Sequence, residues 1–513
     1  MSTLLTNRYN LPIVHHQELF FIVPVLHLPL PSQQGKQSWG QLPGSSLSLV
    51  IAEAARSAQR FTLLLTADSQ SAERLQDELR FFAPDLPVLH FRDWETLPYD
   101  VFSPHQDIIS QRVATLYQLP SLTHGILVVP ISTALQRLAP KDFILGSSLV
   151  LDVGQRLNVD ATRQRLESAG YHCVETVYEH GEFAVRGALI DLFPMGSDVP
   201  YRIDLFDDEI DTLRTFDPET QRSIDTVQSI RLLPAREFPL KKEAITLFRA
   251  RFRDLFDVDY RHCPIYQDLN SGITPAGIEY YLPLFFEENE TATLFDYLPQ
   301  NTQVFSLPGI EQAAEAFWHD VRTRYEDRRY DKQRPVLAPV DLFIPVDECF
   351  ARLKAAPRVV ISHDSVGTGV GKHDFPAHAL PDISLDARAT EPLAKLRQFI
   401  EQFAGRILFT VESAGRREVL LELLARMRLK PSEVDGWNGF LASPERIAIS
   451  LAPLDDPLLI DEPALAVIPE NPLLGQRILQ RRRRDKQRDA GDQVIKTSPN
   501  YVRVRRWYTS TTA

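Results

Sequence analysis

The chain has 513 residues, 44% of them hydrophobic, which is enough for several domains with buried cores and excludes a single small domain. Its formal net charge of −12 excludes a general positive field that would attract nucleic acid, so any such contact has to be local. The three cysteines, Cys173, Cys263 and Cys349, form no C-x-x-C pair, so we expect neither a zinc site nor a disulfide framework, and a reducing cytoplasm as the location.

Residues 1–24 are interpreted as a doubtful N-terminal extension, from a start codon assigned too far upstream. Residues 18–31, ELFFIVPVLHLPLP, are apolar like the core of a signal peptide. They contain three prolines, lack a basic segment before them and an A-x-A cleavage site after them, and are too short to span a bilayer. We therefore expect neither secretion nor a membrane partner.

Residues 25–147 alternate between predicted strands and helices. The runs at 60–68 and 125–130 are continuously apolar, which is typical of strands buried on both faces, and residues 69–82 carry apolar side chains at helical spacing. A helix is also expected after Ser103, with Ser103 as its cap, Pro104 at its first position and Gln106 completing a capping box. Another helix is expected over ISTALQRL. This alternation predicts a parallel α/β sheet.

The rest of the chain divides into four further predicted regions. From 148 to 232, short alternating strands such as FAVRG, ALIDLF, YRIDLF and DTLRTF predict a small α+β insertion domain on an antiparallel sheet. Helices return from 233 to 370, which we predict to be the second segment of the first domain. Residues 371–480 are predicted to form a second small α/β domain, and residues 481–513 a basic linker and tail.

A phosphate-binding loop needs G-x-x-x-x-G-K-[ST] between a strand and a helix, because backbone amides and a lysine hold the phosphates while a hydroxyl holds magnesium. The corresponding stretch here is Gly44, Ser45, Ser46, Leu47 and Ser48, with Leu47 where the lysine is required. We interpret it as a degenerate phosphate loop that does not support ATP chemistry. Two partial look-alikes, TGVGKHD at 368–374 and LLIDEPALAVI at 458–468, are interpreted as a loop and as a strand ending in surface acids.

The run RRRRDKQR at 481–488 is the most basic stretch of the chain, and its first four residues are Arg481, Arg482, Arg483 and Arg484. These arginines are candidates for contact with phosphate backbones. A solvated helical linker is an equally good interpretation. No catalytic or metal-ligating cluster is expected from the scattered histidines and acids.

Arg186 is a single arginine in the apolar strand FAVRG. In the strand YRIDLF, alternation places Tyr201, Ile203 and Leu205 on one face and Arg202, Asp204 and Phe206 on the other. If the first face is core, an arginine and an aromatic ring face solvent, which is the composition of a binding hot spot, and Arg186 can join them. The alternative is that Arg186 only pairs with Asp191 or Asp204, or that Phe206 is core.

The motifs DWETLPYDVFSPHQDIISQR (93–112) and EHGEFAVRGALIDLFPMG (179–196) closely resemble the bacterial transcription-repair coupling factor family, and the resemblance runs from about residue 24 to 496. It implies a domain like excinuclease B without its motor: a degenerate RecA-like sheet in two segments, interrupted by a small domain that binds excinuclease A. Matching the family's binding motif places the contacts at Arg186, Arg202 and Phe206.

The resemblance also implies what this chain does not contain. The family continues into a domain that binds RNA polymerase and a DNA translocase that uses ATP and Mg²⁺, and neither fits within 513 residues. We therefore expect a non-catalytic adaptor that recruits excinuclease A, with no cofactor and with no RNA polymerase or DNA contact of the family's kind. The alternative is ATP-dependent translocase activity. Because the resemblance stops at Lys496, we expect residues 497–513 to be an out-of-frame, disordered tail.

Overall fold

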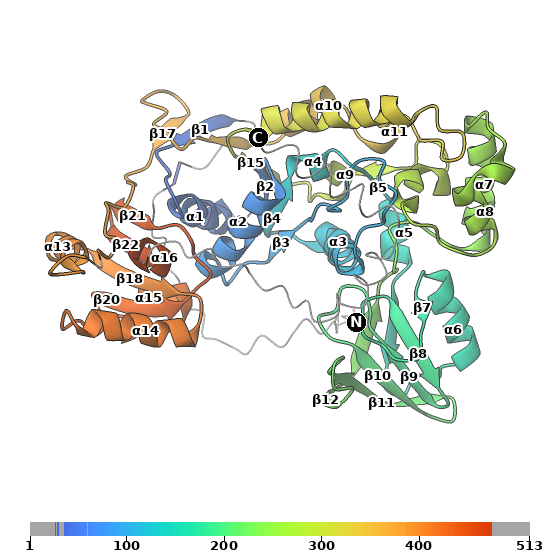
Figure 1. Cartoon of the computed structure of the whole chain (residues 1–513), viewed down its shortest axis with the longest axis horizontal. Helices are drawn as coiled ribbons and strands as arrows, with labels where there is room; N and C mark the ends of the chain where they lie inside the picture. Colours follow the sequence, from blue (N-terminus) through green and yellow to red (C-terminus); the bar gives the residue numbers. More distant parts are fainter. Residues whose placement is uncertain (1–25, 27, 30–34, 59, 387, 475–513) are drawn as a thin grey trace, which may run out of the picture.

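The structure is a computed structural model that describes residues 26, 28–29, 35–58, 60–386 and 388–474. The predicted extension at 1–24, the arginines at 481–484 and the predicted tail lie outside these residues. Three units are visible in Figure 1: a central sheet with helices on both faces, a smaller sheet domain below it, and a third α/β unit beside it. The predicted multidomain α/β fold is confirmed, while the exact domain boundaries stay predictions.

The central sheet has seven strands in the order β17-β1-β16-β15-β2-β4-β3, and every pair in it is parallel. Two distant segments of the chain build it, and they meet where β15 pairs with β2 in the register Thr302↔Phe61 to Ser306↔Leu65. The predicted parallel sheet in two segments is therefore confirmed. The strands are β1 Lys36–Gly40, β2 Phe61–Thr66, β3 Val88–His90, β4 Gly125–Pro130, β15 Thr302–Ser306, β16 Arg358–Ile361 and β17 Lys372–Asp374.

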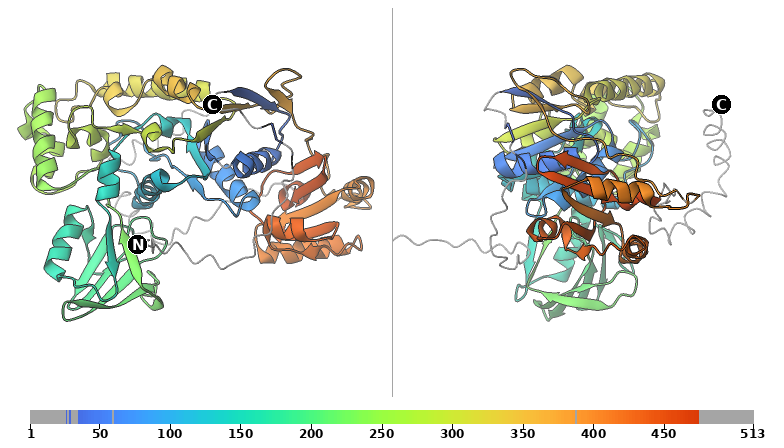
Figure 2. Two further views of the ribbon diagram at one scale, coloured as in Figure 1. Left: turned by 180° about the vertical axis from the view of Figure 1, so that it is seen from behind. Right: turned by 90° about the vertical axis from the view of Figure 1, so that its left-hand side faces the viewer.

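Helices cover both faces of the central sheet, which explains why every residue of β2 and β4 is buried. In β2, Leu64 joins the core under one face, whereas Leu63 and Leu65 join the core under the other face. The first face is covered by α1 (Ser46–Ala58) and α2 (Ser69–Phe82), and the second by α3 (Gln106–Gln118) and α10 (Ile310–Arg328). Figure 2 shows the same arrangement from behind and from one side.

Two local predictions in this region are wrong. Ser103 does not cap α3: its hydroxyl donates to the buried carboxylate of Glu279, and the helix begins at Gln106 with the His105 ring accepting from the amide of Asp107. The helix predicted over ISTALQRL stops after one turn, because the chain turns into the short strand β5 (Arg137–Leu138), which pairs with β14 (Ala292–Thr293). In both cases a contact with residues about 150 or more positions away decides the local structure.

The insertion domain is a six-stranded sheet in the order β12-β11-β10-β9-β8-β7 with helix α6 (Val159–Ser168). The four predicted strands are present, and all neighbours are antiparallel except β7 and β8. The strands are β7 His172–Cys173, β8 Glu182–Arg186, β9 Leu189–Leu192, β10 Tyr201–Phe206, β11 Glu209–Phe216 and β12 Ser223–Val227, and a separate pair joins β6 Leu149–Asp152 to β13 Ser229–Leu232.

The second segment between the insertion domain and β16 is mostly helical, as predicted, and buries many aromatic rings. Phe248 and Phe252 of one helix pack on Tyr281 and Phe285 of another. Residues Ile278–Phe285 form a 3-10 helix, η3, which contains Pro283. The elements not yet named are η1 Leu119–Ser121, α4 Ile131–Ala134, α5 Lys141–Gly146, α7 Lys242–Leu255, η2 Tyr260–His262, α8 Pro264–Asn270, η3 Ile278–Phe285, β14 Ala292–Thr293, α9 Leu294–Tyr297, α11 Pro339–Leu342 and α12 Val346–Lys354.

The third unit, here called the third domain, is a five-stranded sheet in the order β19-β20-β18-β22-β21 with helices around it. Its elements are α13 Ala394–Gln402, β18 Arg406–Val411, α14 Ala414–Ala425, β19 Ser432–Glu433, α15 Gly436–Ala442, β20 Ile447–Leu451, β21 Leu458–Asp461, β22 Ala464–Pro469 and α16 Glu470–Leu474. Across the part of the chain that is described, no helix is long and apolar enough to cross a membrane.

Two polar contacts, one buried and one partly exposed, join the insertion domain and the segment after it to the central unit. Arg112 on α3 donates from Nε to Glu237 Oε1 at 2.5 Å, and both side chains are buried. The Arg112 guanidinium also lies over the rings of Phe91 and Trp94. A second contact joins His180 of the insertion domain to Asp107 at 2.7 Å. Because α3 receives both contacts, the insertion domain is held in one orientation against this helix.

Candidate functional site

The candidate site is the solvent-exposed face of the insertion sheet around Arg186, Arg202 and Phe206, which we call the arginine face. The predicted alternation along β10 is present: Ile203 and Leu205 are buried in the main core, whereas Phe206 is 74% exposed. A register shift between Asp204 and Leu205 does not turn Phe206 inward. The interpretation of Phe206 as a core residue is therefore wrong.

A fully buried carboxylate, Asp191 on β9, holds both predicted arginines. Arg202 donates from Nε to Asp191 Oδ1 at 2.7 Å and from Nη2 to Oδ2 at 3.0 Å, and Arg186 Nη2 also donates to Oδ2. The strands bring these groups together, because Asp191 is the register partner of Arg202 and Arg186 pairs with Leu189 two positions away. The predicted pairing of Arg186 with Asp191 is confirmed, and it occurs together with exposure of Arg186.

The two arginines differ in how much surface they present. The Arg186 side chain is 47% exposed, whereas Arg202 is 15% exposed and lies with Cζ 4.9 Å from the Phe216 ring centroid. The hydrogen bond from Arg202 to Asp191 raises the pKa of Arg202 above its ordinary value, so its positive charge is retained. Arg186 and Phe206 are therefore available for direct contact, while Arg202 mainly supplies charge and supports the surface.

Sequence reasoning missed a neighbouring pair on the same face. Arg214 on β11 donates to Asp204 on β10, and Thr212 donates to the same carboxylate at 2.9 Å. Arg214 is the register partner of Arg202, so it extends the arginine face by one strand. The alternation of DTLRTF could have indicated this residue, because its arginine has the parity of the polar positions.

Another part of the sheet is covered. Val177, Ala184, Phe193 and Phe216 form a small apolar cluster apart from the main core. The arginine face is therefore limited to the open end of the sheet, where Arg186 and Phe206 lie.

The predicted degenerate phosphate loop does lie between a strand and a helix. It follows β1 and leads into α1, which begins at Ser46, and Gly44 has a positive φ of 57°. Leu47 is buried against the core under this face of the sheet, and Ser45, Ser46 and Ser48 are buried as well. No side chain of this stretch faces solvent as a ligand-binding group would.

The look-alike motifs have structural partners. Lys372 of TGVGKHD begins β17, a short edge strand that pairs with β1, so part of the predicted loop is a strand. Asp461 of LLIDEPALAVI is the last residue of β21, as expected for a strand end, and its carboxylate contacts the His378 ring at 2.6 Å. Among the residues that the structure describes, no group of three or more histidines, cysteines or acids could hold a metal ion.

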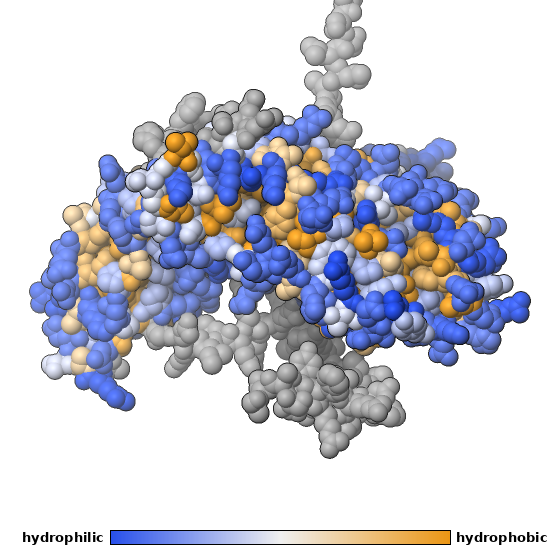
Figure 3. Space-filling view, turned by 90° about the horizontal axis from the view of Figure 1, so that it is seen from above, coloured by the Kyte–Doolittle hydropathy of each residue, from blue (hydrophilic) through white to orange (hydrophobic). Residues whose placement is uncertain are grey.

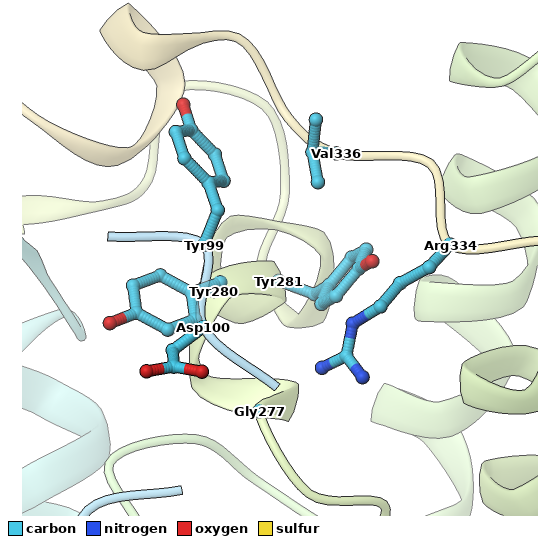
Figure 4. Close-up of a pocket in the computed structure, with 7 residues that line it drawn as sticks. All are labelled: Tyr99, Asp100, Gly277, Tyr280, Tyr281, Arg334 and Val336. Atoms are coloured by element: carbon cyan, nitrogen blue, oxygen red, sulfur yellow. The ribbon is translucent and has the colours of Figure 1, made fainter. Parts of the chain in front are cut away.

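A small cavity lies where the loop at Tyr99 meets the second segment (Figure 4). Its volume is about 10 Å³, which is room for about one water molecule. Arg334 extends from its loop toward the turn at Gly277 and donates to the carbonyl of Ala276 at 2.9 Å. This cavity is too small for a substrate. Figure 3 shows hydrophobic residues as separate patches among hydrophilic ones on the face seen there.

Two family models match separate stretches of the chain. Residues 149–238 match the family model described as the UvrB interaction domain, and residues 399–473 match the model described as the MFD D3 domain. The first match contains the whole arginine face, and the second contains most of the third domain.

Similar full-length proteins are transcription-repair-coupling factors. The chain is 45% identical to that of Escherichia coli over 460 residues, which is 90% of this chain and 40% of the relative, and 45% identical to that of Haemophilus influenzae over 450 residues, which is 87% and 39%. The Bacillus subtilis protein is 29% identical over 279 residues, covering 51% of this chain and 23% of the relative. The chain thus spans about two fifths of the length of the first two relatives. By these matches the chain is similar to the N-terminal part of the transcription-repair-coupling factors.

Proposed function

We propose that this chain is a non-catalytic adaptor that recruits excinuclease A in transcription-coupled nucleotide excision repair, through Arg186, Arg202 and Phe206. One observation carries the proposal: Arg186 is fixed on a buried carboxylate, on the same face of the sheet as a phenylalanine that is three-quarters exposed. The names of the relatives and of the matched domain model support the repair context. Such an adaptor would act in the cytoplasm.

The geometry of the arginine face suits protein recognition. Arginine and aromatic residues are enriched in binding hot spots. Asp191 holds two guanidinium groups by charge-assisted hydrogen bonds, so less side-chain entropy is lost when a partner binds. The exposed part of the Arg186 guanidinium can then donate to a carboxylate or carbonyl of the partner.

The test is binding of purified excinuclease A to the wild-type chain and to the variants Arg186→Ala and Phe206→Ala, measured by calorimetry. We expect each variant to lose most of the affinity while its circular dichroism and unfolding curve stay unchanged. Arg163→Ala is the matched control for the first, because Arg163 is an arginine of the same domain with 52% exposure and an acidic partner, Glu167, at 3.0 Å. Tyr330→Ala is the control for Phe206, because Tyr330 is 75% exposed and lies in the second segment.

Wild-type affinity in folded Arg186→Ala and Phe206→Ala proteins would contradict the proposal. Equal losses in the two control variants would also contradict it, because the effect would then not belong to the arginine face.

We also propose that this chain does not hydrolyse ATP, against the alternative of translocase activity as in the full-length family. Leu47 in place of the required lysine and the burial of Ser45–Ser48 support this proposal. An ATPase assay with and without duplex DNA tests it, with Leu47→Asp as the control for contamination. Activity that this substitution abolishes would establish the alternative.

A further inference from the structure

The loop at Gly44–Ser48 lies against residues 454–458 of the third domain, which are the end of the loop between β20 and β21 and the first residue of β21. The amide of Ser45 donates to the carbonyl of Pro457 at 3.1 Å, and the Ser45 hydroxyl donates to the carbonyl of Asp456 at 2.7 Å. In a nucleotide-binding loop these are the kinds of groups that hold phosphate oxygens. Here carbonyl oxygens from more than 400 residues away occupy that position.

Gly44 makes this close approach possible. Any Cβ at this position would collide with the carbonyl oxygen of Pro457, and the φ of +57° is itself unfavourable for other residues. The glycine therefore allows the backbone of the third domain to approach closely. In a nucleotide-binding loop a glycine allows the same close approach to a phosphate.

A chain of polar side chains continues the contact into the helices. Arg74 on α2 donates from Nη1 to Asp456 Oδ2 at 2.8 Å and to Glu78 Oε1 at 3.0 Å. The other oxygen of Glu78 accepts from the Ser48 hydroxyl. Glu78 is fully buried, so this chain of contacts runs from the loop into the interior.

An apolar contact lies beside the polar one. Trp437 on α15 is buried, with its ring centroid 5.0 Å from that of Phe82 and 6.1 Å from that of Phe81 on α2. The same core cluster contains Leu49 of α1 and Leu458 of the third domain. Figure 1 shows α1 and α2 on the side of the central unit that faces the third domain.

We propose that Gly44–Ser48 is a docking socket for residues 454–458 of the same chain, and that this internal contact, in place of a nucleotide, holds the third domain against α1 and α2. The socket and a bound triphosphate exclude each other, because both require the Ser45 amide and hydroxyl. The proposal is independent of the arginine face, which lies on the insertion domain.

The test compares Gly44→Ala with the wild-type chain by limited proteolysis and small-angle X-ray scattering. Because the added Cβ collides with Pro457, the variant should release the third domain, with cleavage in residues 375–386 about tenfold faster and a larger radius of gyration. Gly146→Ala is the matched control, since an added Cβ there meets nothing within 4 Å, and it should behave as wild type.

A second variant covers the case in which Gly44→Ala does not fold. Asp456→Ala removes the carboxylate from Arg74 at a partly exposed position, so it should fold and show the same direction of change to a smaller extent. Unchanged cleavage and scattering in folded Gly44→Ala and Asp456→Ala proteins would overturn the proposal. Binding of a fluorescent ATP analogue to the wild-type chain with the third domain still docked would overturn it as well.

Discussion

The loop at Gly44–Ser48 and the arginine face both carry groups able to bind an anion or an acidic partner, but the fold uses them in opposite ways. In the loop, the amide and hydroxyl of Ser45 bond to the third domain and are buried. On the arginine face, Asp191 satisfies only part of each guanidinium, and Arg186 and Phe206 remain exposed. Burial by other parts of the chain, more than residue type, therefore decides whether such groups form an internal contact or a binding surface.

Removal of the Asp191 carboxylate should have the largest effect on the arginine face. Asp191→Ala leaves Arg202 without its acid at a largely buried position, and losing one partner of a buried ion pair costs about 3–5 kcal/mol. We expect the free energy of unfolding to fall by that amount and affinity for excinuclease A to fall as well. Urea denaturation measures the first effect. Asp191→Asn keeps the shape and should lose less, and equal stability of wild type and Asp191→Ala would contradict the role given to Asp191.

Phe206→Ala should separate binding from stability. Because Phe206 is largely exposed, its loss should change the free energy of unfolding by less than about 0.5 kcal/mol. A hot-spot aromatic is worth about 2 kcal/mol or more, so affinity for excinuclease A should fall roughly thirtyfold. Calorimetry and denaturation on the same preparation test both parts, and a stability loss as large as the affinity loss would mean that Phe206 is structural.

The docking socket should make stability depend on pH through Glu78. Burial, opposed by Arg74 and the Ser48 hydroxyl and assisted by Asp456, raises the pKa of Glu78 to about 7 from an ordinary value of 4.5. The folded state therefore binds this proton more tightly than the unfolded state. The contribution of Glu78 to the free energy of unfolding is complete below about pH 4.5 and is lost as the pH rises through 7. The loss is on the order of 2 kcal/mol between pH 5 and 8.

Glu78→Gln isolates this contribution, because the amide keeps a partner for Ser48 without a titratable proton. We expect the difference in unfolding free energy between pH 5 and pH 8 to be smaller in the variant than in the wild type. The same pH dependence in both proteins would show that Glu78 does not titrate in this range.

The smallest effect is expected from substitution of Arg214, which tests how far the arginine face extends toward β11. Arg214 pairs with Asp204, and both side chains are partly exposed, so Arg214→Ala should cost less than about 1 kcal/mol of stability. We expect a measurable but modest loss of affinity for excinuclease A. A loss as large as that of Phe206→Ala would move the centre of the surface toward β11.

Much of the fold could be predicted because local pattern and final burial agree. The runs at 61–66 and 125–130 are mostly apolar, and both strands are buried on both faces. Ser103 has every local feature of a cap, yet its hydroxyl serves Glu279, 176 residues away. The short edge strand β17 was missed because its residues carry no strand pattern and are held by pairing with β1.

The site was predictable in part for the same reason. Alternation along YRIDLF was enough to place Phe206 outside and Ile203 inside. It could not reveal that one carboxylate serves two arginines, nor that Arg202 is mostly covered, because both facts depend on register across three strands. The contact of Ser45 with Asp456 spans 411 positions and leaves no trace in local sequence.

The buried pair of Arg112 and Glu237 affects the orientation of the insertion domain relative to the central unit. Glu237 follows the last strand of the insertion domain, and Arg112 belongs to the helix that also receives His180. A protein bound to the insertion sheet would therefore have a fixed orientation relative to the central unit, because α3 belongs to that unit. Any domain joined rigidly to the central unit would then have a defined orientation relative to the bound protein.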